Sequence, residues 1–306
     1  MAIGLAAAMV RDMSRAFYIH AGAHRTGTSS LQMCLHDNRD VLEGAGFDLA
    51  FPGRDGVPSG TLALRLPRPR HGKPMMDEFR TKARAQINAL TRDPAHSMIL
   101  SEENIPGPMK HFYQGRFFPG AGKRCRVLRH AMADGHVDTL LFVVRDYAGL
   151  FVSSWRKRAE DNPMEPFKET VPAYMNMDRG WPELVLTLQQ ELQPKRFVLV
   201  EHSSRKPRAE LLNLLCPQTK AMALTEPAGN LNVSATDAGL NALQSRFQSG
   251  ETLDRAEWQS VIAKHADDTR DLGLTGFNSK DHSALNARYA ADLYRLRDMP
   301  GIEFIV

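Results

Sequence analysis

Short, almost continuous apolar runs alternate along the chain with longer segments in which apolar residues recur at helical spacing. The apolar runs predict strands at 16–22, 46–51, 97–101, 139–144 and 196–201. The helical spacing predicts helices at about 27–44, 75–93, 123–134, 147–160, 181–192 and 207–215. Apolar strands separated by helices are typical of an α/β fold. We therefore expect a mainly parallel central sheet with helices on both faces, joined by right-handed crossovers.

Beyond about residue 234 the pattern becomes largely helical. Apolar positions around Leu240, Trp258 and Leu285 predict three helices packed on the core. Before this region, the proline-rich segment 161–172 predicts an irregular stretch. The chain has 306 residues, of which 42% are hydrophobic, and this is enough for a sizeable core. Because no internal repeat or linker divides it, we expect one domain over 1–306, with a mainly helical extension from about 234.

The residues between the first strand and the first helix have the composition of an anion-binding loop. Gly22 and Gly27 have G-x-x-x-x-G spacing, and glycines allow successive backbone N–H groups to converge on one point. Arg25 adds a permanent charge, and further donors come from the hydroxyls of Thr26, Thr28, Ser29 and Ser30. Position 28 is Thr where the nucleotide-hydrolysing loop has Lys. The pattern therefore favours a phosphate monoester or a phosphosulfate over a triphosphate.

The run HAGAHRTGTSSLQ from His20 to Gln32 resembles the 5′-phosphosulfate loop of sulfotransferases, whose usual pattern is H-x-G-x-x-K-T-G-T-T-S-L-Q. This resemblance implies a P-loop NTPase-like fold, 3′-phosphoadenosine 5′-phosphosulfate (PAPS) as sulfuryl donor, and the 3′,5′-bisphosphate (PAP) as product. It assigns donor binding to His24, Arg25, Thr26, Gly27, Thr28, Ser29 and Ser30. Arg25 stands at the family's Lys position. Its guanidinium keeps the charge and binds two oxygens but does not readily release a proton, so we expect an electrostatic catalytic role.

Arg145 and Ser153 form a second candidate pair. Arg145 follows the fourth predicted strand, where a side chain faces the crevice in which α/β sheets bind ligands, and Ser153 follows eight residues later. Since an Arg and a Ser at this spacing bind the 3′-phosphate in the family, the resemblance assigns that role here. The alternative is that Arg145 pairs with the next residue and Ser153 lies on a solvated helix face. A segment at 230–234 also resembles one in bacterial members, although helix capping by Ser234 or Thr236 explains it equally well.

Two carboxylates follow the strand 97–101 and are candidates for a general base. Sulfuryl transfer to an alcohol or amine benefits from a base that takes the acceptor's proton. The S-E-E run resembles the Ser-Ser-Glu pattern of several sulfotransferases, which ranks Glu103 first and Glu102 second. Adjacent strand residues face opposite ways, so we expect one of them to reach the site. Weaker candidates for the base are His20, His24 and His111.

The charge balance gives little further information about partners. A net charge of +4 and a pI near 9.0 suit an anionic cofactor, but the excess is too small to indicate nucleic-acid binding. Prolines interrupt a basic cluster, which predicts an exposed loop that is either solvated or meets an acidic acceptor. The cluster consists of Arg65, Arg68, Arg70, His71 and Lys73.

The cysteines and the first residues of the chain bear on four further features: a metal site, disulfides, a secretory signal and a membrane span. The three cysteines Cys34, Cys125 and Cys216 have neither metal-binding nor disulfide-framework spacing, so we expect no metal site. The apolar patch in 1–13 is short and lacks the basic leader of a secretory signal. No apolar run is long enough to span a bilayer, and a cytoplasmic location is expected.

These patterns and the resemblance together predict a PAPS-dependent sulfotransferase acting on a small-molecule or carbohydrate acceptor. Two alternatives remain open from the sequence. One is a P-loop kinase, which shares the architecture but needs the missing Lys and a Mg²⁺-binding carboxylate. The other is a non-catalytic PAPS-binding or polysaccharide-assembly module, which needs no working base.

Overall fold

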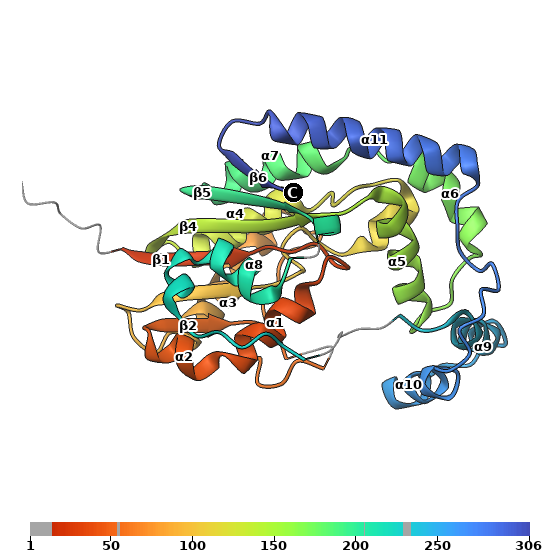
Figure 1. Ribbon diagram of the computed structural model, residues 1–306, viewed down its shortest axis with the longest axis horizontal. Helices are drawn as coiled ribbons and strands as arrows, with labels where there is room; N and C mark the ends of the chain where they lie inside the picture. Colours follow the sequence, from red (N-terminus) through yellow and green to blue (C-terminus); the bar gives the residue numbers. More distant parts are fainter. Residues whose placement is uncertain (1–13, 54–55, 205, 229–233) are drawn as a thin grey trace, which may run out of the picture.

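A single parallel sheet forms the centre of the computed structural model, which describes residues 14–53, 56–204, 206–228 and 234–306 (Figure 1). The strand order is β2-β3-β1-β4-β5-β6, and every neighbouring pair is parallel. The strands are β1 (Arg15–His20), β2 (Phe47–Ala50), β3 (Ser97–Ser101), β4 (Gly135–Val144), β5 (Arg196–Glu201) and β6 (Ile302–Ile305). The predicted α/β fold with a parallel central sheet is confirmed.

Helices fill most of the connections between these strands. They are α1 (Thr28–Asp37), α2 (Arg39–Gly44), α3 (Met76–Ala89), α4 (Ala121–Ala131), α5 (Tyr147–Ala159), α6 (Phe167–Met175), α7 (Trp181–Leu192), α8 (Arg208–Leu215), α9 (Asp237–Gln248), α10 (Arg255–Lys264) and α11 (Ser279–Arg297). Short 3₁₀ turns are η1 (Lys73–Met75), η2 (Met109–Gln114), η3 (His202–Ser204) and η4 (Pro217–Ala221). The single helix predicted over 27–44 is two helices. The chain breaks at Asn38, whose side-chain amide donates to the carbonyl of Cys34 at 2.8 Å.

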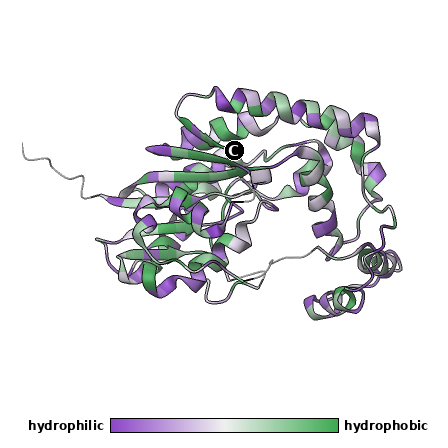
Figure 2. Ribbon diagram, in the orientation of Figure 1, coloured by the Kyte–Doolittle hydropathy of each residue, from purple (hydrophilic) through white to green (hydrophobic). Residues whose placement is uncertain are grey.

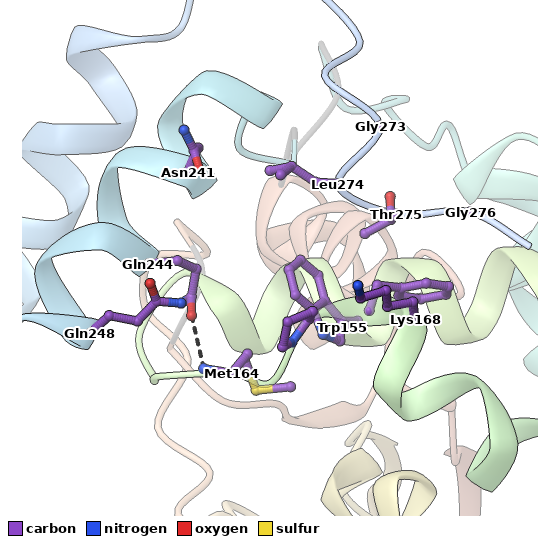
Figure 3. Close-up of a pocket in the computed structure, with 12 residues that line it drawn as sticks. Trp155, Met164, Lys168, Asn241, Gln244, Gln248, Gly273, Leu274, Thr275 and Gly276 are labelled. Carbon is purple, nitrogen blue, oxygen red and sulfur yellow. Dashed lines mark hydrogen bonds between the residues drawn. The ribbon is translucent and has the colours of Figure 1, made fainter.

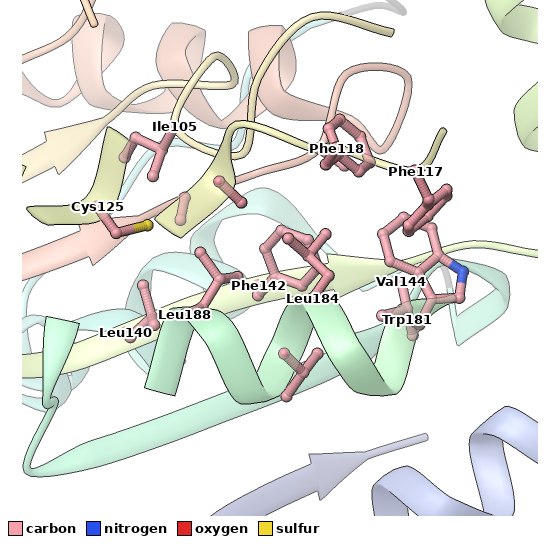
Figure 4. Packing of buried hydrophobic residues seen from close by; sticks show 14 of the residues in the cluster. Ile105, Phe117, Phe118, Cys125, Leu140, Phe142, Val144, Trp181, Leu184 and Leu188 are labelled. Carbon is pink, nitrogen blue, oxygen red and sulfur yellow. The ribbon is translucent and has the colours of Figure 1, made fainter. Parts of the chain in front are cut away.

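Two hydrophobic cores cover the two faces of the sheet. Alternation along β4 sends Leu140, Phe142 and Val144 into one core, shared with α3, α4 and α7. Figure 4 shows these side chains against Trp181 and Leu184 of α7. The residues between them point into the second core, which α1, α2 and α8 cover. Burying each large apolar side chain contributes about 1.5–3 kcal/mol, and hydrophobic residues accordingly dominate the central strands (Figure 2).

The irregular structure predicted for 161–172 is wrong in its second half. Helix α6 begins at Phe167 and continues through Pro172. Phe167 and Tyr174 are buried, and Phe167 packs edge-on against Phe277 at 5.2 Å between ring centres. This burial stabilises the helix despite the missing N–H of Pro172.

The region after residue 234 is helical, as predicted, but its helices differ in how they pack. Helix α9 buries Leu240 and Leu243, whereas α10 has no buried residue and contacts α9. Helix α11 runs across α7 and α5 along one side of the molecule (Figure 1). It leads into β6, a strand that the sequence pattern did not predict, which pairs with β5. Among the described residues, no helix combines the length and apolar character needed to cross a membrane.

Candidate functional site

The candidate site lies at the carboxyl edge of the sheet, where parallel α/β sheets bind ligands. Strand β1 ends at His20 and is followed by the glycine-containing loop, which leads into α1 at Thr28. Strand β3 ends beside it on one flank at Ser101, and β4 ends on the other at Val144. The topology therefore brings the loop, the two carboxylates and Arg145 to one edge.

Both glycines of the loop are required by its geometry. A Cβ on Gly22 would lie 2.5 Å from the hydroxyl of Thr28 and 2.9 Å from the ring of His20. Gly27 has a φ of +91°, in the left-handed region that glycine adopts without strain. Arg25 also has a positive φ, 69°, and such strain in a side-chain-bearing residue is concentrated at functional sites.

The backbone of the loop presents donors at its helical end. The N–H groups of Thr26, Gly27, Thr28 and Ser29 donate to no acceptor in the part of the chain that the structure describes. The threonine hydroxyls have a different role from the one predicted, because those of Thr26 and Thr28 donate to the carbonyl of Ala23 at 2.6 and 3.3 Å. Both threonines are buried, whereas Ser29 and Ser30 are half-buried. The amides and the two serines thus remain the loop's available donors.

Arg25 is hydrogen-bonded to residues that are distant in sequence. Its Nε donates to the hydroxyl of Ser153 at 2.6 Å, and its Nη2 donates to the hydroxyl of Ser234 at 2.8 Å. The structure thus brings Arg25, assigned to the 5′-phosphosulfate, together with Ser153, assigned to the 3′-phosphate. Thr236 accepts from Gly239 as the N-cap of α9, so capping does not account for Ser234.

Arg145 lies against the same loop. Its Nη1 donates to the carbonyl of Arg25 at 2.8 Å, and burial lowers the pKa of its guanidinium. Its Nε forms an ion pair with the carboxylate of Asp146 at 3.9 Å, as the alternative expected, and has no hydrogen-bond partner within the described residues. Ser153 is buried, so the alternative of a solvated helix face is wrong for it. An incompletely hydrogen-bonded guanidinium beside the loop is suited to an anionic ligand.

The two carboxylates after β3 face different surroundings. Glu103 accepts a hydrogen bond at 3.0 Å from the side-chain amide of Gln32 on α1, and its charge acts on His20. Glu102 accepts from the backbone N–H of Asn104 at 2.8 Å, and its charge acts on Arg124 of α4. Both are buried. Glu103 is therefore the carboxylate on the side of the glycine loop, whereas Glu102 faces α4.

The histidine candidates for the base differ in position. His20 is fully buried, its Nδ1 is 2.9 Å from the hydroxyl of Ser101, and burial lowers its pKa to about 4. The Nε2 of His24 lies 2.9 Å from the side-chain amide oxygen of Asn104. This contact links the glycine loop to the segment after the carboxylates. His111 lies in η2 and interacts with Gln114. Of the three, only His24 is a half-buried residue of the loop itself.

A cavity of about 410 Å³ adjoins the glycine loop on the side of β4 and β5. Thr26, Gly27 and Ser30 form one wall. The opposite wall includes residues that the sequence analysis missed: Glu201, His202, Ser204, Lys206 and Arg208. No motif marks these residues, because they come together only when β5 pairs with β4. The volume is in the range of small-molecule sites.

A second hollow, of about 340 Å³, lies between α5, α6 and α9 (Figure 3). Its floor consists of Trp155, Met164 and Phe167. The side-chain amide of Gln244 also lines it but is hydrogen-bonded to backbone groups. The oxygen of this amide accepts from the N–H of Met164 at 2.8 Å. Lys168 is the one cation in its lining. This hollow contains none of the residues assigned to the donor.

Other reactive groups do not extend the candidate site. Cys34, Cys125 and Cys216 are free and buried, and burial raises the pKa of each thiol to about 12. Within the described ranges, no three His, Cys, Asp or Glu side chains are grouped as a metal site would require. No protein-family model matches this chain, and no curated protein matches it.

Proposed function

We propose that this chain is a sulfotransferase that moves a sulfuryl group from PAPS to a hydroxyl or amine of an acceptor. The observation that carries the proposal is the loop from Gly22 to Ser29, in which four backbone N–H groups have no acceptor within the described chain. Arg25 and Arg145 add two guanidinium groups beside it. Such an arrangement favours an anion with several oxygens.

The surroundings of the loop support a nucleotide-linked anion. The cavity on the β4 and β5 side opens against Thr26 and Gly27, and its far wall carries Lys206 and Arg208. It has room for a nucleoside next to the loop. Lys206 and Arg208 pair with Glu210 at 3.1 Å and Glu226 at 3.6 Å, so the 3′-phosphate role stays with Arg145 and Ser153, which lie outside the lining of this cavity. Thr28 in place of Lys argues against a triphosphate, since that Lys binds the β- and γ-phosphates.

The proposed reaction is an in-line transfer. Glu103 takes the proton of the acceptor hydroxyl as the acceptor oxygen forms a bond to sulfur. The bond between sulfur and the bridging phosphate oxygen breaks, and its electron pair leaves with PAP. Loop N–H groups and Arg25 stabilise the charge that grows on that oxygen. One such donor is worth about 2.7–4 kcal/mol, and base catalysis contributes about 10²–10⁴-fold.

The location of Glu103 supports its role over that of Glu102. Gln32 ties Glu103 to the helix that follows the loop. The donor cavity lies on the β4 and β5 side of the loop, and Glu103 lies on the β3 side. In an in-line transfer, the acceptor oxygen approaches sulfur from the side opposite the leaving group. The base that takes the acceptor's proton must therefore lie on the flank opposite the donor.

Calorimetry with PAP and with Mg²⁺-ATP tests this proposal directly. We expect PAP to bind and ATP to bind more weakly, and labelled sulfate from PAPS to be transferred to a component of a cell extract. Binding and turnover of ATP without PAP binding would instead identify a kinase. PAP binding without transfer to any fraction would identify a non-catalytic module.

A further inference from the structure

The proline-rich segment 62–74 lies over the start of α4 and is held there through its backbone. Arg124 of α4 donates from Nη1 to the carbonyls of Leu66 at 3.2 Å and Pro67 at 2.9 Å. Lys123 donates to the carbonyls of Pro69 at 3.0 Å and His71 at 3.1 Å. The segment is thus fixed on the protein surface, which the prolines alone did not predict.

The side chains of this segment form a row of exposed cations. Arg65, Arg68, Arg70 and Lys73 are exposed, and none has an ion pair within the described chain. We call these four residues the basic row. Several other exposed arginines are paired with carboxylates, for example Arg84 with Asp134, whereas Arg116, Arg255 and Arg297 have no ion pair among the described residues. The basic row differs in that four such cations lie within positions 65–73. Unpaired like charges close together repel one another, so a row of them indicates an anionic partner.

The basic row lies on the same side of the glycine loop as the candidate base. Arg124 donates both to Pro67 of the segment and, through Nε, to the carbonyl of Asn104 at 2.9 Å. Asn104 directly follows Glu103 and also contacts His24 of the loop. The row therefore adjoins the flank of β3, across the loop from the donor cavity.

A hollow of about 460 Å³ continues from the end of the row, between α3 and α4. Its lining has the cations Lys73, Arg80, Lys123 and Arg126, against one carboxylate, Asp77. Arg80 pairs with Asp77 at 2.9 Å and Arg126 pairs with Glu191 of α7, whereas the Lys123 ammonium donates to backbone carbonyls. The hollow thus carries a net positive charge.

We propose that the basic row and this hollow bind the acceptor, and that the acceptor is an acidic saccharide. This inference rests on the proposed function, which requires a hydroxyl near Glu103. A saccharide with carboxylate or sulfate groups supplies that hydroxyl together with repeated negative charges. The only aromatic ring in the lining is His71, which stacks on Phe79 at 5.0 Å. A single-stranded nucleic acid would require exposed aromatic platforms, so a saccharide is the better match.

Binding of an oligogalacturonate and of a neutral maltose oligosaccharide of equal length tests the proposal by calorimetry at low salt. We expect the acidic oligosaccharide alone to bind, and added salt to weaken its binding. The variant R68E/R70E/K73E should bind it about tenfold or more weakly than the unchanged protein. The unchanged and variant proteins should bind PAP equally, because the three residues lie outside the donor site.

A matched variant, R255E/K264E/K280E, reverses three exposed cations on α10 and α11 and changes the net charge by the same amount. It should keep the affinity for the acidic oligosaccharide, and thermal unfolding should show that both triple variants are folded. Equal binding of the two oligosaccharides, or equal losses in the two variants, would overturn the proposal. If the unchanged protein binds oligogalacturonate but does not bind PAP, the sulfotransferase function is refuted and the site remains an anionic-saccharide site.

Discussion

The Nε of Arg25 donates a 2.6 Å hydrogen bond to the hydroxyl of Ser153, although 128 positions separate them in the sequence. One residue belongs to the glycine loop after β1, and the other lies on the second turn of α5, after β4. The bond exists because β1 and β4 are neighbours and end at the same edge. Two motifs that the family resemblance assigns to two ends of one ligand thus meet at one point.

Replacing Arg25 with Ala should weaken PAP binding and reduce sulfate transfer about 10²–10³-fold, because one preorganised charged donor is removed from the loop. Arg25→Lys keeps a charge without the planar fork and should retain part of the activity. Calorimetry and initial rates measure both effects. Equal PAP affinity in Arg25→Ala and the unchanged protein would exclude Arg25 from the donor site.

Replacing Gly22 with Ala should disrupt the loop. The new Cβ would lie 2.5 Å from the Thr28 hydroxyl, and overpacking of this kind costs about 1–3 kcal/mol. Gly44, at the end of α2, has open space around it, so Gly44→Ala is the control. Thermal unfolding and PAP titration should show losses for Gly22→Ala alone. A stable Gly22→Ala variant with full PAP affinity would show that this close approach is unimportant.

Replacing Glu103 with Gln should slow transfer about 10²-fold, at the lower end of the range for general-base catalysis, while PAP binding is retained, since a general base acts on the acceptor. Glu102→Gln is the comparison, because Glu102 faces Arg124 rather than the loop. Arg25→Ala should lower turnover more than Glu103→Gln does. If Glu102→Gln has the larger effect on rate, with the protein folded, Glu102 is the base.

The stability of the fold should depend on pH through His20. Burial lowers the pKa of His20 from 6.5 to about 4, and the charge of Glu103 opposes this shift only in part. Between these values the unfolded chain binds a proton that the folded protein does not. The free energy of unfolding should therefore fall as pH decreases through this range, by about 3 kcal/mol in all, and be fully present above it.

Urea unfolding from pH 4 to pH 7 measures this dependence. His20→Asn keeps a polar group near Ser101 but cannot take up the proton, so its profile should be flatter over the same range. His282→Asn, on the exposed face of α11, should keep the profile of the unchanged protein. Parallel profiles for the unchanged protein and His20→Asn would show that another group is responsible.

Local sequence patterns were sufficient for the strands and helices that bury a regular apolar set. Strands β3 and β5 and helix α7 have the predicted bounds. In each strand an apolar run is bounded at both ends by a polar residue, and α7 begins and ends on a buried apolar residue. The apolar pattern predicted the wrong secondary structure where contacts with distant parts of the chain stabilise an element. Pro172 lies inside α6 because Phe167 and Tyr174 are buried on either side of it.

The candidate site was predictable only where a motif is continuous in sequence. The loop, the two carboxylates and Arg145 were identified because each directly follows an apolar strand. The cavity residues Lys206 and Arg208 carry no signal of their own, since their position depends on the pairing of β5 with β4. The attachment of segment 62–74 depends on two side chains of α4, which lie about fifty positions later.

Strand β6 forms one edge of the sheet, beside β5. Strand β6 has four residues and carries Glu303, whose carboxylate pairs with Arg196 of β5 at 2.7 Å. A short outer strand with a charged side chain is a poor template for backbone pairing with another molecule. Without β6, the longer and more apolar β5 would be the outermost strand. We therefore expect these four residues to limit edge-to-edge association, and their removal to lower solubility.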